Sequence, residues 1–277
     1  MKTGKTVAII LAGGSGSRMG GPVKKQFALL AGRPLICHTL QTFQEYDGVD
    51  EIVLVTSAAG PSGGDMPEIE YVKKEIIEKY GFEKVKAVVP GGAERYHSVY
   101  AGLMACRSAT RQHDALADSA AKGSSTQEAT YVLIHDGARA FISKQVLDNI
   151  MAGLKKTDAC VAAVPVKDTI KKADEECIVT QTLDRKELYA MQTPQAFSYD
   201  LVMSAYRRLI EEEQAGGEAA SAHNKALVTD DAMVVEKYNP EQKILLTEGS
   251  YENIKVTTPD DLLYGEFLLG RRSETRP

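Results

Sequence analysis

The first residues that could do chemistry lie in a glycine-rich segment, residues 11–27, which reads Leu-Ala-Gly-Gly-Ser-Gly-Ser-Arg-Met-Gly-Gly-Pro-Val-Lys-Lys-Gln-Phe. Glycines let backbone amides approach a ligand without an intervening side chain, and Arg18, Lys24 and Lys25 add positive charge beside them. This combination predicts a site for a polyphosphate. The alternative interpretation is a glycine-rich turn with solvated lysines.

The spacing within this segment excludes the two commonest phosphate loops. A P-loop needs Gly-Lys followed directly by Ser or Thr, and no such triplet occurs in the chain. The dinucleotide pattern Gly-x-Gly-x-x-Gly fails because Met19 stands where the third glycine should follow Gly14 and Gly16. The segment therefore indicates another class of nucleotide site.

A second candidate group is the segment 90–99, Pro-Gly-Gly-Ala-Glu-Arg-Tyr-His-Ser-Val. It places Gly91, Gly92, Arg95 and Ser98 after an apolar run and before a helical pattern that extends towards residue 107. Glycine amides in front of a helix can bind a phosphate or the edge of a base. The same residues could equally form only a turn and a helix cap.

A third candidate is the pair Asp136 and Arg139, which follows the apolar run 131–135. An Asp at the end of a strand, three residues before an Arg, suits a contact with a metal-bound phosphate or a hydroxyl group. An Asp that caps the next turn, beside a solvated Arg, is the alternative.

The elements that must position these residues form an alternating pattern. Apolar runs of strand length alternate with segments of helical spacing, which implies parallel β-α-β units. We therefore predict an α/β fold with a Rossmann-like, doubly wound and mostly parallel sheet, whose ligands bind at the carboxyl ends of the strands. The expected strands are 7–11, 51–56, 85–89, 131–136, 159–166 and 243–247, and the main helices are 35–45, 68–80, 143–156 and 199–213.

Several segments depart from this alternation, although we expect one domain over residues 1–277. Short β-prone pieces around a polar turn at 173–176 predict a hairpin, a protruding β-arm at about 167–190 that packs on another subunit. Segments at about 107–129 and 214–225 have few large apolar residues and are predicted to be surface insertions, the latter a soft loop. Residues 191–197 are predicted to form a polar-aromatic turn.

The composition excludes several classes of function. A net charge of -5 over 277 residues shows no basic surplus for a nucleic-acid partner. No run of about 18 apolar residues occurs, so we expect no membrane segment. The four scattered cysteines contain no Cys-x-x-Cys pair, which favours reduced thiols and a cytoplasmic location.

Taken in order, eight motifs resemble one family, the 2-C-methyl-D-erythritol 4-phosphate cytidylyltransferases of the non-mevalonate isoprenoid pathway. The resemblance runs from residue 7 to about 269. It rests on Gly-Ser-Arg-Met with Lys-Lys-Gln-Phe, Gly-Gly-Ala-Glu-Arg, Ile-His-Asp-Gly-Ala-Arg, Pro-Val-Lys-Asp-Thr-Ile, Leu-Asp-Arg, Gln-Thr-Pro-Gln-Ala-Phe, Thr-Asp-Asp-Ala and Asn-Ile-Lys-Val-Thr-Thr-Pro-Asp-Asp-Leu.

The resemblance implies a nucleotide-diphospho-sugar transferase type of fold and an enzyme that joins CTP to 2-C-methyl-D-erythritol 4-phosphate with Mg²⁺, as a homodimer joined by its arms. It assigns catalysis to Arg18, Lys25 and Lys255. Asp136 would lie near Mg²⁺ and the ribose, and Arg185 would reach the acceptor phosphate in the other subunit's site. The remaining substrate-binding positions are Ala12, Gly13, Gly14, Gly91, Gly92, Ala93, Arg95, Ser98, Arg139, Thr169 and Thr193.

The chain departs from the family pattern at three positions. Lys24 precedes Lys25 where the family commonly has a proline, Ala140 follows Arg139 where a proline is usual, and Ala93 replaces a usual Asp. We expect Lys24 to be solvated. Two alternatives stay open: a cytidylyltransferase acting on ribitol 5-phosphate, and a nucleotide-binding module without turnover.

Overall fold

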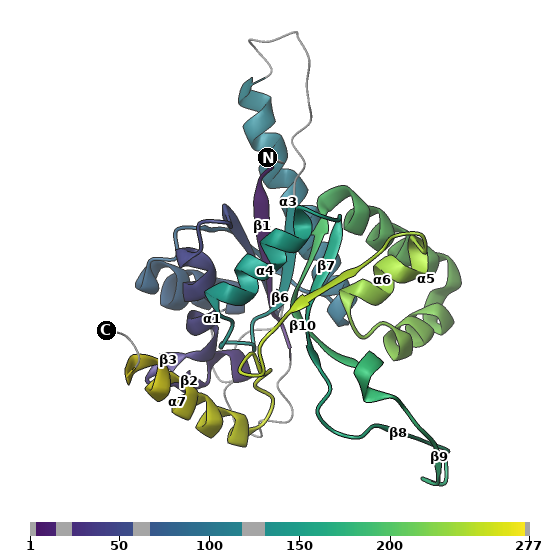
Figure 1. Cartoon of the computed structure of the whole chain (residues 1–277). Helices are drawn as coiled ribbons and strands as arrows, with labels where there is room; N and C mark the ends of the chain where they lie inside the picture. The colour runs from purple at the N-terminus through teal and green to yellow at the C-terminus, as the bar shows by residue number, and fades with distance from the viewer. Residues whose placement is uncertain (1–3, 15–23, 58–66, 118–130, 275–277) are drawn as a thin grey trace.

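A seven-stranded sheet forms the centre of the protein. The computed structural model describes residues 4–14, 24–57, 67–117 and 131–274. The strands lie in the order β11-β7-β10-β6-β1-β4-β5, and β10 alone in this sheet runs antiparallel to its neighbours. The predicted α/β class and mostly parallel sheet are confirmed (Figure 1). The strands are β1 Thr6–Ala12, β4 Glu51–Thr56, β5 Val85–Pro90, β6 Tyr131–Asp136, β7 Ala159–Pro165, β10 Tyr189–Ser198 and β11 Leu245–Glu248.

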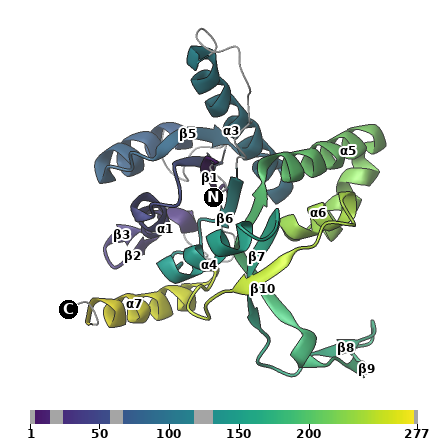
Figure 2. The ribbon, with the colours of Figure 1, turned by 45° about the horizontal axis from the view of Figure 1, so that its top comes forward.

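Helices cover both faces of this sheet, as Figure 2 shows. Alternate residues of a strand point to opposite faces, so Ala8 and Ile10 enter one core cluster and Val7 and Ile9 enter the other. The first cluster packs against α1 Leu35–Glu45, α4 Lys144–Leu154 and the helical segment α2 Glu68–Tyr71 with η3 Val72–Glu78. The second packs against α3 Arg95–Ala117, α5 Tyr199–Leu227 and α6 Asp231–Tyr238.

Strand β10 corrects the prediction of a turn at 191–197. The segment is a central strand that pairs with both β6 and β7, with an irregularity between Met191 and Gln195. Gln192, Thr193 and Gln195 are buried in it. Because these buried residues are polar, the sequence lacks the alternation of apolar and polar residues that indicates a strand. Each of the three side chains is hydrogen-bonded to another segment.

The two predicted insertions have different outcomes. The soft loop expected at 214–225 is wrong, because α5 continues to Leu227 with non-helical backbone angles at Gly217, where φ is 61°. Gly217 therefore produces a kink within a longer helix. Helix α3 extends through the first part of the other segment to Ala117, and residues 118–130 lie outside the described part of the chain.

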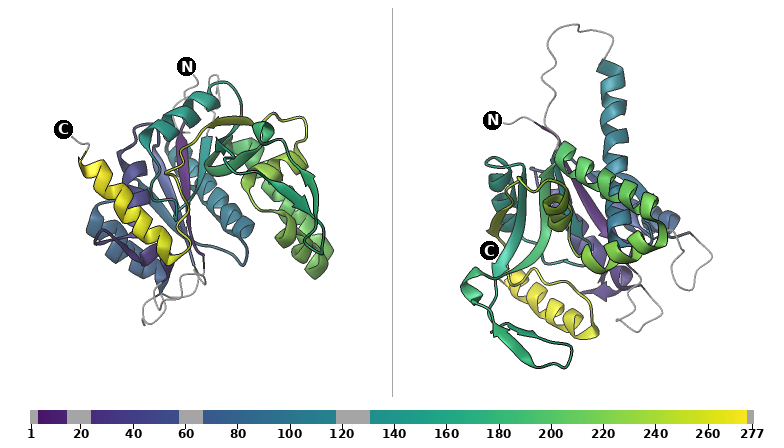
Figure 3. Two further views of the ribbon diagram at one scale, coloured as in Figure 1. Left: turned by 60° about the horizontal axis from the view of Figure 1, so that its bottom comes forward. Right: turned by 90° about the vertical axis from the view of Figure 1, so that its right-hand side faces the viewer.

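Beyond the sheet, a hairpin and a C-terminal helix flank the body. Strands β8 Lys171–Ala173 and β9 Val179–Thr182 pair antiparallel, and the hairpin projects away from the sheet (Figure 1). Helix α7, Pro259–Glu274, packs near the small ladder of β2 Leu29–Leu30 and β3 Arg33–Pro34 (Figure 3). Within the described ranges, no helix has the length and apolar character to cross a bilayer.

Candidate active site

The carboxyl ends of four neighbouring strands meet at one edge of the sheet. Ala12 at the end of β1 is in register with Thr56 at the end of β4, and Thr56 is in register with Pro90 of β5. On the other side, Leu11 pairs with Asp136 of β6. Three segments predicted to bind the nucleotide, which begin at residues 12, 91 and 136, therefore start from the same edge.

The turn at Gly91 and Gly92 is built against the end of β4. The Gly91 amide donates to the Thr56 carbonyl oxygen at 2.7 Å, and the Gly92 amide donates to the Ser98 hydroxyl at 3.2 Å. A Cβ on Gly91 would lie 2.6 Å from the Ser98 Oγ, so a larger residue would displace that hydroxyl. Ser98, which was predicted near the base or ribose, thus shapes the backbone that precedes Ala93.

Asp136 is the centre of the charged groups at this edge. Its Oδ2 lies 2.6 Å from the Lys255 Nζ and its Oδ1 lies 3.4 Å from the Arg95 Nε. Burial alone would raise the pKa of Asp136, but the charges of Arg95 and Lys255 outweigh it and hold this pKa well below its usual range. The carboxylate is therefore ionised at neutral pH, and it brings together three residues predicted for the site.

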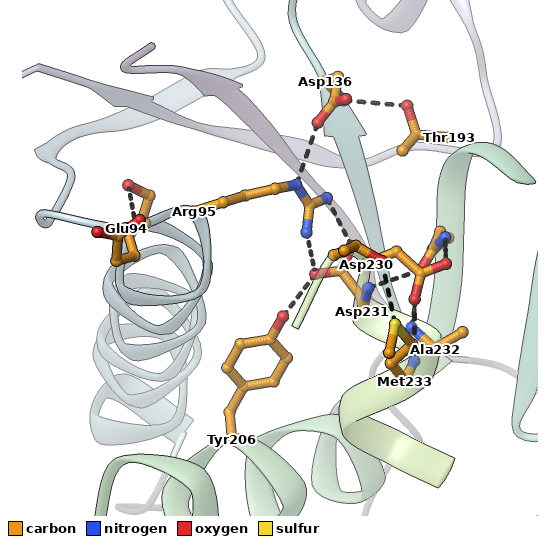
Figure 4. Close-up of polar contacts among 12 residues, drawn as sticks. Glu94, Arg95, Asp136, Thr193, Tyr206, Asp230, Asp231, Ala232 and Met233 are labelled. Carbon is orange, nitrogen blue, oxygen red and sulfur yellow. Dashed lines mark hydrogen bonds and ion pairs between the residues drawn. The ribbon is translucent and has the colours of Figure 1, made fainter. Parts of the chain in front are cut away.

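Asp231 is a site residue that the sequence did not single out for chemistry. It is completely buried and accepts hydrogen bonds from Nη1 and Nη2 of Arg95, each at 2.8 Å, and from the Tyr206 hydroxyl at 2.5 Å (Figure 4). A bidentate carboxylate fixes the plane of a guanidinium group as well as its position. The Thr-Asp-Asp-Ala motif was the available signal. Asp230 of the same motif caps α6 by accepting from the Met233 amide.

Thr193, in the middle of β10, is bonded to the end of β6. The Asp136 amide donates to the Thr193 hydroxyl oxygen at 3.0 Å, and this hydroxyl lies 3.1 Å from Nδ1 of His135. The other ring nitrogen of His135 lies 3.2 Å from the Arg139 carbonyl oxygen. Thr193 is only 5% exposed, and this bond to the Asp136 amide fixes the end of β6 that carries Asp136.

The segment before α7 is anchored by Asn253. This buried amide donates to the Thr193 carbonyl oxygen at 2.9 Å, and the Asn253 carbonyl accepts from Nη1 of Arg139 at 2.7 Å. Three residues later, the Val256 amide donates to the Ala138 carbonyl oxygen at 2.9 Å. These bonds place Lys255 beside Asp136 and tie Arg139 to the same segment.

The two lysines of the glycine-rich segment have different surroundings. Lys25 begins the short helix η2, Lys25–Phe27, and its Cε lies 3.9 Å from where a Cβ on Gly14 would be. The prediction that Lys24 is solvated is wrong, because its Nζ lies 2.5 Å from Oε2 of the fully buried Glu68 and its side chain is only 11% exposed. The partner is 44 residues away in sequence, and no local pattern indicated it. Arg18 lies outside the described residues.

Comparison with known proteins decides the family. The family model for 2-C-methyl-D-erythritol 4-phosphate cytidylyltransferase matches residues 6–124 and 108–271. A protein of that name from Alkaliphilus oremlandii is 40% identical over 272 residues, which cover 98% of both chains. The chain belongs to the 2-C-methyl-D-erythritol 4-phosphate cytidylyltransferase family. Another protein of that name, from Lachnospira eligens, is 42% identical over 264 residues. That match covers 95% of this chain and 99% of the Lachnospira protein.

A solved structure agrees with this cytidylyltransferase assignment. The structure of 4-diphosphocytidyl-2C-methyl-D-erythritol synthase from Anaerococcus prevotii superposes with a TM-score of 0.70 at 29% identity. The match covers 97% of this chain and 99% of the other. The fold of the cytidylyltransferase family therefore extends over nearly the whole protein.

Two residues that the family resemblance assigned to substrate binding lie on the segment of the projecting hairpin, apart from the strand-end cluster. Thr169 and Arg185 are exposed and belong to the segment that carries the β8-β9 hairpin. Nη1 of Arg185 donates to the Lys167 carbonyl oxygen at 3.0 Å, which holds the base of the hairpin together. Their roles towards an acceptor stay predictions.

The arrangement offers positive charge and fixed backbone amides rather than a covalent nucleophile. Asp136 pairs with Arg95 and Lys255, while Arg139 and Lys25 add cations from two other segments. Within the described residues, no group of three or more His, Cys, Asp or Glu side chains is placed to hold a metal ion. Such a site suits a reaction in which negative charge grows on phosphate oxygens.

Proposed function

We propose that this protein transfers the cytidylyl group of CTP to the phosphate of 2-C-methyl-D-erythritol 4-phosphate and releases pyrophosphate. Membership of the cytidylyltransferase family supports the substrates. The structural observation that carries the proposal is the buried Asp136 carboxylate, which gathers Lys255 and Arg95 at the carboxyl edge of the sheet. Ligands of open α/β sheets bind at this edge.

The proposed chemistry needs alignment and positive charge. A phosphate oxygen of the acceptor attacks the α-phosphorus of CTP in line, the bond to the β-phosphate oxygen breaks, and pyrophosphate leaves. Lys25 and Lys255 stabilise the negative charge that develops, with Arg18 in the same role. The backbone of Ala12, Gly13 and Gly14 and the turn at 91–93 hold the nucleotide.

We propose Mg²⁺ as the metal of this reaction. Mg²⁺ commonly binds through one or two carboxylates together with substrate phosphates, and Asp136 is an ionised carboxylate at the strand ends. One such ligand fits an ion that is carried mainly by the triphosphate. When bound, it would supply Lewis-acid charge to the phosphate oxygens.

We also propose a cytoplasmic homodimer joined by the arm at 167–190. The exposed β8-β9 hairpin carries Ile178, just before β9, and Val179, the first residue of β9, which are 63% and 57% exposed. A two-stranded hairpin is marginal alone and gains stability by packing on another chain. In this arrangement Arg185 reaches the acceptor phosphate of the partner site, with Thr169 near the acceptor.

Release of pyrophosphate tests the reaction. The assay supplies CTP and Mg²⁺ with either 2-C-methyl-D-erythritol 4-phosphate or ribitol 5-phosphate, and mass spectrometry identifies the CDP-linked product. We expect product only from the first acceptor. A preference for ribitol 5-phosphate would reject the proposed substrate, and CTP binding without product would support a module without turnover. Lys255→Met should abolish product, whereas Lys237→Met, in an exposed pair with Glu212, should not.

Mixed dimers test the shared site. Arg185→Ala and Lys255→Met proteins are each expected to be inactive, and they are unfolded and refolded together. A mixed dimer then contains one site with both residues intact. Random pairing gives half mixed dimers, so about a quarter of wild-type activity should return. No recovery, with mixed dimers present by native mass spectrometry, would show that Arg185 acts within its own subunit.

A further inference from the structure

Glu68 is a fully buried carboxylate with no role in the reaction described so far. It is the first residue of α2, and its exposed fraction is 0%. Its Oε1 accepts from the Thr56 hydroxyl and, at 3.0 Å, from the Ser57 amide, while its Oε2 lies 2.5 Å from the Lys24 Nζ. One carboxylate therefore joins the start of α2, the end of β4 and the residue before Lys25.

The contacts of Glu68 lead to both parts of the nucleotide site. Thr56, which donates to Glu68, also accepts the Gly91 amide through its carbonyl oxygen at 2.7 Å. The Thr56 carbonyl carbon lies 3.5 Å from where a Cβ on Gly13 would be, so the first glycine segment packs on the same strand end. On its other side, Glu68 holds the residue that leads into η2.

The charge of Glu68 needs an explanation beyond packing. Burying an ionised carboxylate is costly unless it is paired and hydrogen-bonded, and replacing a buried ion pair with apolar residues is often neutral or stabilising. Such a pair is best explained by a need for one defined geometry. Lys24 stands directly before Lys25, so fixing the Lys24 side chain limits how η2 can rotate or shift.

We propose that Glu68 is a positioning residue for nucleotidyl transfer. Paired with Lys24, it fixes η2 against the end of β4 so that Lys25 is directed at the phosphates of CTP. This inference rests on the proposed function for the role of Lys25.

The test compares Glu68→Gln, Lys24→Met and the double variant with the wild type. The glutamine can still accept from Thr56 and Ser57, so the change removes chiefly the pair with Lys24. We expect kcat to fall about 10- to 100-fold, the scale of a small displacement of a reacting group. The KM for the acceptor should change little, because the residues assigned to the acceptor lie on other segments. The double variant should be no worse than the poorer single one.

Two further variants separate positioning from folding. Lys24→Arg keeps a cation for Glu68 and should recover most of the lost kcat. Glu70→Gln on the same helix removes an exposed pair with Lys74 and should leave kcat unchanged. Wild-type kcat in Glu68→Gln, with only a lower melting temperature, would overturn the proposal.

Hydrogen exchange of the free protein gives a readout that needs no turnover. Peptides that contain residues 24–30 should exchange faster in Glu68→Gln than in the wild type or Glu70→Gln. Absence of turnover in the wild type would refute the proposed reaction, and the exchange result would then decide alone whether Glu68 holds η2. Equal exchange in all three proteins would overturn the inference.

Discussion

His135 makes the stability of the candidate active site depend on pH in a way that can be measured. The imidazole is completely buried, with Nε2 beside the Arg139 carbonyl oxygen and Nδ1 beside the Thr193 hydroxyl. A carbonyl oxygen can only accept, so Nε2 carries the hydrogen and Nδ1 accepts from Thr193. Burial lowers the pKa of His135 from 6.5 to about 4, although the neighbouring Asp136 charge acts in the opposite direction.

The direction of the effect follows from this lowered pKa. In the folded protein His135 stays neutral down to about pH 4, whereas in the unfolded chain it takes up a proton near pH 6.5. Between these values the unfolded state binds more protons, so its population rises as the pH falls. The contribution of neutral His135 to the free energy of unfolding is fully present above pH 6.5. The free energy of unfolding should therefore fall by about 2 kcal/mol between pH 8 and pH 5.

Urea denaturation at pH 8 and pH 5 checks this value in the wild type and in His135→Asn. The asparagine oxygen can still accept from Thr193, but the variant loses the bond to the Arg139 carbonyl oxygen and is less stable at both pH values. Between pH 8 and pH 5, the free energy of unfolding of His135→Asn should fall by about 2 kcal/mol less than that of the wild type. The pKa of His38 is also lowered by burial, and its effect cancels because both proteins contain it. Equal pH dependence in the two proteins would refute the reasoning.

Three other substitutions have defined expectations. Lys25→Ala should lower kcat by about 10²- to 10³-fold, the effect of removing one preorganised charge, and a smaller loss than in Lys24→Met would reject Lys25 as the catalytic lysine. Asp231→Asn should lower the free energy of unfolding by about 3 kcal/mol, because it leaves the Arg95 guanidinium without its bidentate partner; urea denaturation giving less than about 0.5 kcal/mol would contradict this. Gly137→Ala should cost about 1–3 kcal/mol in the same assay, since the added Cβ would lie 2.9 Å from a backbone oxygen, and unchanged stability would show that the strand end can move.

The parts of the fold that the sequence predicts well are those with a local physical cause. The runs at β1, β4 and β6 are apolar and rich in β-branched residues, and their ladders form in the order that parallel β-α-β units require. Because parallel strands end at one edge, the segments at 12–14, 91–93 and 136 could be expected to lie together. Chain order and strand direction were enough to predict that these segments lie at one edge.

The parts that could not be predicted depend on partners far apart in sequence. Asp231 is buried because Arg95, which is 136 residues earlier, supplies two hydrogen bonds. Lys24 is likewise paired with the buried Glu68, which is 44 residues later in the sequence. Strand β10 has polar residues at buried positions because Gln195 caps α6 through the amides of Asp231 and Ala232. A local sequence pattern shows that such residues are polar. It does not show which distant residues form their hydrogen bonds or ion pairs.

The two cations on Asp136 are held in different ways, and this separates their roles. Both terminal nitrogens of Arg95 are occupied by Asp231, so its guanidinium is fixed and its Nε alone faces Asp136. Lys255 is 38% exposed at its side chain and contacts Asp136 with one of three ammonium hydrogens. It can keep that contact and donate the others to a phosphate. We therefore expect Arg95 to fix the position of Asp136 and Lys255 to be the cation that meets the nucleotide.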